Sequence, residues 1–212
     1  MKTDDLISRL AADRQTHRIA PGAALVAAVV VATVIAAVLL MTTIGPRPDI
    51  AQAAMTWRFD FKFVVTLVLA VSSFWLVRQA IYPEGLSKAP LWLLLASPAV
   101  LLGGVAVELA TLPGSAWLMS AIGKNSQLCL TIVPALGLVP LVLILWGLKQ
   151  GAPTRPMLSG FFAGLLAGGI AATFYAANCT DDSPLFVLTW YPISILALGL
   201  VGALLGRVAL RW

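Results

Sequence analysis

The sequence predicts an all-α integral membrane protein built as a bundle of six transmembrane helices, and three observations support this fold class. Only 11% of the 212 residues are charged. In contrast, 60% are hydrophobic and the mean hydropathy is +0.94. Soluble domains carry about 25% charged residues, so the composition excludes a soluble enzyme, a disordered chain and a nucleic-acid-binding domain. The apolar stretches are also continuous rather than alternating, which favours helices over barrel strands.

Six long apolar stretches are candidate spans, because each can cross a hydrocarbon core of about 30 Å at about 1.5 Å per residue. The second has Lys62 at its start, and the fourth contains Pro134 and Pro140, which membrane helices tolerate as kinks. In chain order the stretches cover residues 20–44, 61–77, 91–109, 128–148, 157–177 and 185–208. We therefore expect a transmembrane domain over residues 19–212 that follows a polar tail over residues 1–18.

The distribution of Lys and Arg predicts the orientation of the chain. An even number of spans places both termini on one side of the membrane, and the cytoplasmic side carries the excess of basic residues. Ten of the 14 Lys and Arg residues lie on the side of the termini and four on the other side. We therefore expect both termini in the cytoplasm. The net charge of +5 then reflects orientation, and we expect no direct nucleic-acid binding.

Glycines recur at a spacing of four in the last two spans, which places them on one face of each helix. Such faces let two membrane helices approach closely. We expect them to pack the bundle internally, with a dimer interface as the alternative. They are Gly160, Gly164 and Gly168 in the fifth span and Gly202 and Gly206 in the sixth.

Charged residues are absent from the centres of the spans, and the two that come closest are Lys62 and Glu108. Both lie near the non-cytoplasmic surface in the expected orientation. We expect a structural ion pair between them, and an ion or proton site is the alternative. A small transporter or a transporter subunit is the competing function for the whole chain. It would call for a charge at mid-span or an inverted repeat, and the sequence shows neither.

The two cysteines, Cys129 and Cys179, both fall on the non-cytoplasmic side. A structural disulfide, a reversible thiol switch that senses oxidants or metals, and two inert buried thiols are the alternatives. A complete metal site is not expected, because tetrahedral sites need four N or S ligands and the single histidine, His17, lies in the tail. The thiols could still hold a thiophilic ion with Asp181 and Asp182. We expect no cofactor.

The tail has the pattern of a short amphipathic helix. Thr3 can cap it, acidic residues suit its first turn, and an apolar stripe follows. The mixture of Asp and Arg around this stripe favours a protein partner over the membrane surface. The acidic residues are Asp4 and Asp5, and the apolar stripe contains Leu6, Ile7 and Leu10. No catalytic motif is present anywhere in the sequence, so we expect a non-enzymatic protein.

The tail MKTDDLISRLAAD, the six spans and the cysteine in each of two outer segments resemble the NrsF-like family of bacterial inner-membrane anti-sigma factors. The resemblance implies a multi-pass inner-membrane protein that sequesters an extracytoplasmic-function sigma factor. It implies release of that factor on a periplasmic stress signal such as a heavy metal or an oxidant. It assigns sensing to Cys129 and Cys179. The candidate sigma-factor contacts that it implies are Asp4, Asp5, Leu6, Ile7 and Leu10.

Overall fold

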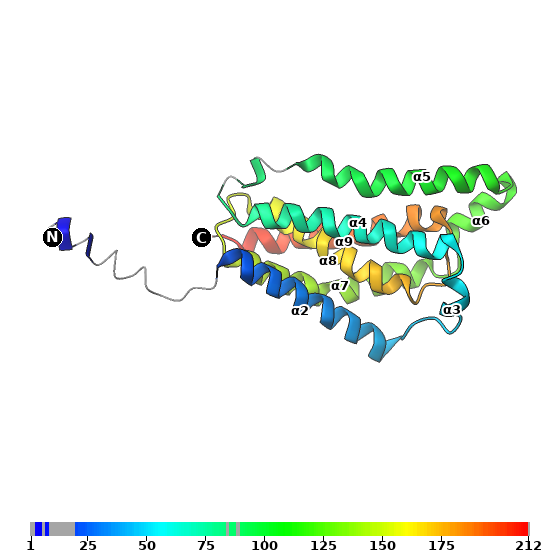
Figure 1. The fold of residues 1–212 in the computed structure, drawn as a ribbon, viewed down its shortest axis with the longest axis horizontal. Coiled ribbons are helices and arrows are strands. Elements are labelled where there is room, and N and C mark those ends of the chain that lie inside the picture. Colours follow the sequence, from blue (N-terminus) through cyan, green and yellow to red (C-terminus); the bar gives the residue numbers. More distant parts are fainter. Residues whose placement is uncertain (1–2, 6, 9–19, 84, 88–89, 212) are drawn as a thin grey trace.

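The computed structural model describes residues 3–5, 7–8, 20–83, 85–87 and 90–211, and it is a bundle of six long helices (Figure 1). All six are long and apolar enough to cross a membrane. The third span consists of α5 (Ala96–Thr111) and the short 3₁₀ helix η2 (Leu91–Leu95) that precedes it. The predicted six-helix membrane fold is therefore confirmed. The helices are α2 (Pro21–Thr43), α4 (Trp57–Ala80), α5 (Ala96–Thr111), α7 (Ser126–Lys149), α8 (Pro156–Ala176) and α9 (Pro184–Ala209).

The helices follow the expected spans, and the differences lie near the ends of the bundle. α4 extends beyond the expected 61–77 in both directions, because its terminal charges reach ionic partners or solvent. Two short helices, α3 (Ile50–Ala53) and α6 (Trp117–Ile122), lie between spans and were not expected. Elements this short show no apolar period in the sequence. Two short 3₁₀ helices, η1 (Gly85–Ser87) and η3 (Gly114–Ala116), complete the described elements.

The bundle has two ends with different contents. α2 begins and α9 ends at the same end, which also carries residues 81–83 and 150–155; we call it the tail end (Figure 1). The opposite end carries the loops 44–56, 112–125 and 177–183. We call it the cysteine end, because Cys179 lies in the last of these loops and Cys129 in the first turn of α7.

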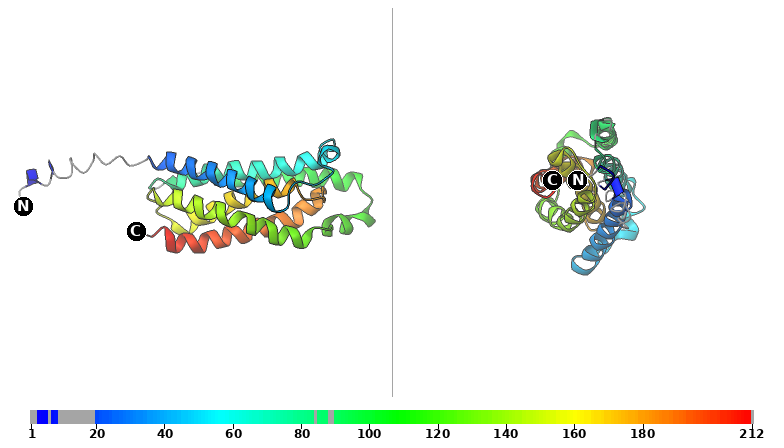
Figure 2. Two further views of the ribbon diagram at one scale, coloured as in Figure 1. Left: turned by 90° about the horizontal axis from the view of Figure 1, so that it is seen from below. Right: turned by 90° about the vertical axis from the view of Figure 1, so that its left-hand side faces the viewer.

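Helix α8 is the central element of the bundle. It packs against α2, α4, α7 and α9, and 72% of its apolar stretch is buried. α5 packs mainly on α4 and α9, and the view along the bundle shows α2 and α5 at its periphery (Figure 2). The core is therefore built around α8, and its neighbours expose their other faces toward lipid.

The contact between α8 and α9 is formed by glycines. A Cβ atom added at Gly160 would collide with the carbonyl oxygen of Gly202, and one at Gly164 with the carbonyl oxygen of Leu198. A Cβ at Gly206 would lie 2.6 Å from the carbonyl oxygen of Pro156. The glycine faces of both helices therefore lie inside the bundle. Gly168 continues the same interface, where an added Cβ would lie 2.9 Å from Cγ2 of Ile195.

We expect Gly164→Ala to lower the free energy of unfolding by about 2 kcal/mol, because the new methyl group overlaps backbone that can move only if α8 and α9 separate. Gly103→Ala on α5 is the matched control, since a Cβ there meets nothing within 4 Å. Thermal unfolding of the purified protein in detergent, followed by circular dichroism, measures both variants. Equal midpoints for the two would contradict the close α8–α9 packing.

Candidate functional site

The α8–α9 loop, residues 177–183, is held at the cysteine end by Arg47 of the loop between α2 and α3. The guanidinium of Arg47 donates to both carboxylate oxygens of Asp182 at 2.9 and 3.0 Å and to Asp49 at 2.7 Å. Its backbone N–H donates to the carbonyl of Ala177 at 3.0 Å. The hydrogen bonds that Arg47 donates to Asp49 and Asp182 hold its pKa above the ordinary value, and the pKa of Asp49 is lowered in return.

Lys62 of α4 holds the same loop from the inside of the bundle. Its ammonium group is 0% exposed, lies 2.6 Å from Asp182 and donates to the carbonyl of Cys179 at 2.9 Å. The ring of Phe59, one turn earlier on α4, lies 5.2 Å from the Lys62 Nζ and adds a cation–π contact. A buried ammonium needs this complete set of partners, because loss of one leaves an uncompensated charge.

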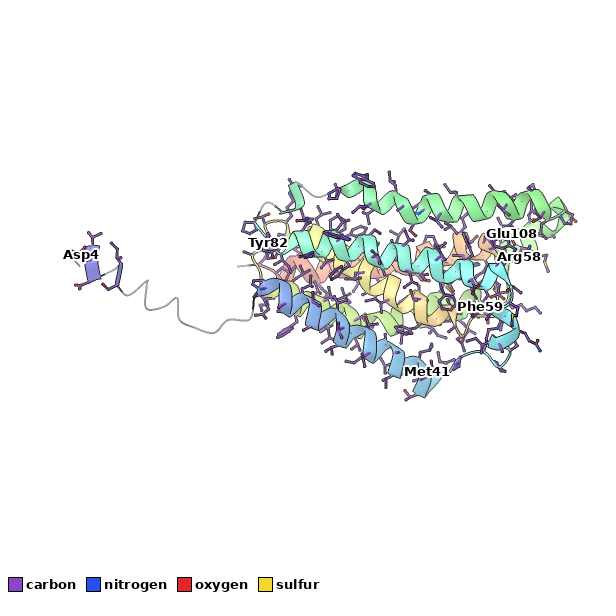
Figure 3. All side chains as sticks on the ribbon, in the orientation of Figure 1. Asp4, Met41, Arg58, Phe59, Tyr82 and Glu108 are labelled. Carbon is purple, nitrogen blue, oxygen red and sulfur yellow. The ribbon has the colours of Figure 1, made fainter. Side chains whose placement is uncertain are left out.

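Glu108 of α5 binds the other end of the loop. Its carboxylate accepts from the Ser183 hydroxyl at 2.7 Å and from the Leu185 N–H at 3.0 Å, so it caps the start of α9. Arg58 of α4 lies 3.4 Å away from its other oxygen. Figure 3 shows Arg58 and Glu108 together at this end.

The expected ion pair between Lys62 and Glu108 is therefore wrong. Lys62 pairs with Asp182, and Glu108 pairs with Arg58. The physical reason is that the α8–α9 loop folds inward and brings its own carboxylate to Lys62. Asp182 lies in a loop outside the spans, so the sequence indicates it only as a possible metal ligand.

Asn125 joins the two cysteine-bearing segments. Its backbone N–H and its side-chain amide donate to the same oxygen of Asp181 at 2.7 and 2.8 Å, and the amide also reaches Thr180. Its carbonyl accepts the backbone N–H of Cys129 at 2.8 Å. The start of α7, where Cys129 lies, is thus bonded directly to the loop that carries Cys179. Proximity of the two segments could not be read from residues 50 positions apart in the sequence.

Both cysteines are free thiols buried in the protein, Cys129 at 0% and Cys179 at 1% exposure. Burial raises the pKa of Cys179, and the nearby Lys62 ammonium opposes the rise. Ser194 of α9 lies 3.8 Å from Sγ of Cys129. Within the described residues, no group of three or more His, Cys, Asp or Glu side chains could hold a metal ion. Asp181 and Asp182 already bind Asn125, Arg47 and Lys62.

The tail residues are only partly described. Residues 3–5 and 7–8 are helical, and the Ser8 hydroxyl donates to the carbonyl of Asp4 at 2.8 Å. Asp4, Asp5 and Ile7 are exposed. Leu6 and Leu10, the other candidate contact residues, lie outside the described residues.

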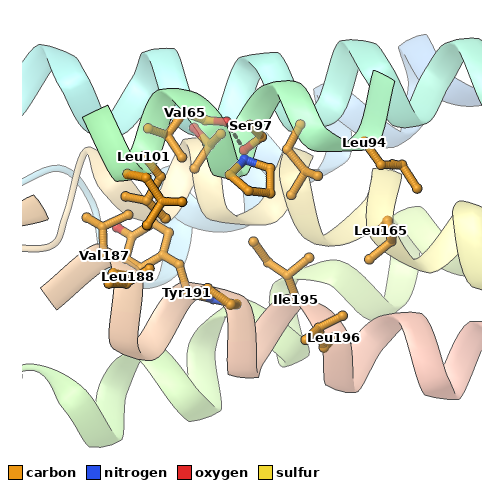
Figure 4. A pocket seen from close by; sticks show the side chains of 15 residues that line it. Val65, Leu94, Ser97, Leu101, Leu165, Val187, Leu188, Tyr191, Ile195 and Leu196 are labelled. Carbon is orange, nitrogen blue, oxygen red and sulfur yellow. Dashed lines mark hydrogen bonds between the residues drawn. The ribbon is translucent and has the colours of Figure 1, made fainter. Parts of the chain in front are cut away.

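An apolar pocket of about 390 Å³ lies between α4, α5, α8 and α9 (Figure 4). No charged side chain is among the residues that line it. The Ser97 hydroxyl in its wall donates to the carbonyl of Val65 at 3.0 Å, so this polar group is already satisfied. The hydroxyl of Tyr191, another lining residue, is buried and has no hydrogen-bond partner among the described residues. The pocket therefore offers a neutral hydroxyl and no charged group to a ligand.

The chain is similar to known proteins along almost its whole length. The family model described as "Negative regulator of sigma F" matches residues 10–212. This chain belongs to that family. The anti-sigma-F factor NrsF of Caulobacter vibrioides is 36% identical over 220 residues, and the probable anti-sigma-F factor NrsF of Azospira oryzae is 31% identical over 217 residues. Both alignments cover all of this chain and all of the relative. No solved structure matches the chain.

We expect Asp182→Asn to increase the reaction rate of Cys179 with a maleimide about tenfold. The change leaves the buried Lys62 ammonium without its carboxylate partner and leaves Arg47 with Asp49 alone as an ionic partner, which favours opening of the loop. A Cys129→Ser background restricts the signal to Cys179. Asp60→Asn is the matched control: Asp60 is exposed on the same end of α4 and has no ionic partner among the described residues. If both variants label at the parental rate, the ion pairs do not hold the loop closed.

Proposed function

We propose that this protein is a non-enzymatic anti-sigma factor of the bacterial inner membrane. It sequesters an extracytoplasmic-function sigma factor through its cytoplasmic tail and releases it on a periplasmic stress signal, a metal or an oxidant, that acts on Cys129 and Cys179. The observation that carries the proposal is the full-length similarity to two relatives named anti-sigma-F factors. Six apolar helices with an excess of Lys and Arg at the tail end support the location and the orientation.

The tail supports the binding half of the proposal. The described helical residues of the tail include the exposed side chains of Asp4, Asp5 and Ile7. This combination of acidic and apolar groups is expected for a segment that docks in a partner's groove. A helix of about 15 residues is marginal in water by itself, so binding would complete its folding. Leu6 and Leu10 belong to the same proposed contact by their spacing in the sequence.

The geometry of the cysteine end supports the sensing half. Chemical change at either thiol disturbs a loop that is bonded to α4 through Lys62 and to α5 and α9 through Glu108. A bundle with two packings can carry this change to the tail end. Release by a factor of ten to a hundred needs a coupling free energy of about 1.4 to 2.8 kcal/mol, within the usual range of allosteric coupling.

Deletion of residues 2–13 tests the role of the tail. We expect the shortened protein to insert in the membrane, because all six spans are intact, and to lose capture of the sigma factor. The measurement is affinity purification of the full-length and shortened proteins from the native cells, with retained sigma factors identified by mass spectrometry. Equal capture by the two proteins would remove the tail from the proposed interface.

Replacement of both cysteines by serine tests the sensing role. The substitution keeps the size and hydrogen bonding of the groups close to the original, so we expect the sigma factor to be captured as before. Exposure of the cells to cadmium or hydrogen peroxide should then fail to release it, whereas the parental protein releases it. Normal release from the double variant would exclude the thiols as the sensor.

A further inference from the structure

A second cleft of about 360 Å³ opens at the tail end, where three segments converge. It is lined by Pro21 at the start of α2, by Ile81, Tyr82 and Pro83 after α4, and by residues 150–152 between α7 and α8. Unlike the pocket at the level of the spans, it is formed largely by loop residues beyond the helix ends. It therefore faces the compartment that the tail occupies.

The floor of the cleft is fixed by backbone contacts. The N–H of Ala152 donates to the carbonyl of Ile81 at 2.9 Å, and a Cβ at Gly151 would lie 2.6 Å from that same carbonyl oxygen. On the other side, a Cβ at Gly22 would lie 3.4 Å from the Tyr82 hydroxyl. The Tyr82 hydroxyl therefore lies beside the first turn of α2, which directly follows the tail, while the side chain as a whole is 50% exposed (Figure 3).

The charges of the tail end have one dominant sign. By sequence the loops and helix ends of the tail end carry six basic residues against a single acidic one, Glu84; the basic residues are Arg78, Lys88, Lys149, Arg155, Arg207 and Arg211. Lys149 and Arg155 flank the 150–152 segment and are exposed. The surface is thus suited to an acidic partner.

We infer that this cleft is the second half of the sigma-factor interface: it receives a projecting side chain from an acidic face of the sigma factor that the tail binds. The inference rests on the proposed function and extends it from the tail to the membrane domain. Continuity supports it, because the tail joins the bundle at Pro21, in the wall of the cleft, so a partner bound to the tail is kept beside it. Tyr is one of the residue types that are enriched among interface hot spots, and Tyr82 is half exposed beside the fixed floor of the cleft.

The test is the affinity of the purified full-length protein in nanodiscs for the sigma factor identified by affinity purification. We expect Tyr82→Ala, Ala152→Trp and Lys149→Glu each to raise Kd about tenfold, by removal of the aromatic contact, by filling of the cleft and by reversal of a rim charge. Lys149→Glu should also weaken the dependence of Kd on salt. The matched controls are Ala152→Ser, and Lys124→Glu on the exposed surface of the cysteine end; both should bind within about twofold of the parental protein.

The outcomes separate the two proposals. If the parental protein captures no sigma factor, the proposed function and the cleft both fail. If the parental protein binds, the tail deletion loses binding and all three cleft variants keep the parental Kd, the cleft alone is overturned. Should Lys149→Glu reduce binding to phosphatidylglycerol vesicles while its Kd for the sigma factor is unchanged, the basic rim serves the lipid surface and the inference is likewise overturned. Unfolding midpoints of the variants identify any loss of binding that is due to misfolding.

Discussion

A charged side chain at the edge of a lipid bilayer needs its counter-charge beside it, and this requirement shapes the cysteine end of the bundle. Lys62 and Glu108 are both fully buried. Each of them binds the α8–α9 loop, Lys62 through Asp182 and Glu108 through Ser183 and the start of α9. The loop cannot leave without exposing two buried charges to an apolar surrounding. It is therefore a structural part of the membrane domain and more than a connection between two helices.

The spans could be predicted from the sequence, but the contacts that the loops make could not. Long apolar stretches must become helices in a membrane, so each expected span has its helix, and the spacing of Gly160 and Gly164 marks a face that packs on α9. The partner of Lys62 depends instead on how a loop 117 positions away folds back over α4. No local pattern records such a fold, and α3 and α6 were missed because they are too short to show a period.

Helix α4 contacts both the cysteine end and the tail-end cleft of the bundle. Near its start Lys62 binds the loop of Cys179, and directly after its end the carbonyl of Ile81 binds Ala152 in the floor of the tail-end cleft. Between these points α4 packs along the central helix α8. A shift of α4 along α8 would alter both places together. The coupling that the proposed function requires therefore has a physical candidate in one helix.

The complete burial of both thiols limits how fast they can react with a dissolved reagent. A dissolved reagent reaches Cys179 only while the loop is open, so at low reagent concentration the reaction rate is proportional to the concentration multiplied by the open fraction. At high concentration the rate reaches a ceiling equal to the rate at which the loop opens. Arg47 and Lys62 keep the loop closed and so set that ceiling. At high reagent concentration, the ion pairs that hold the loop would then limit the reaction rate of Cys179 more than the intrinsic reactivity of its sulfur does.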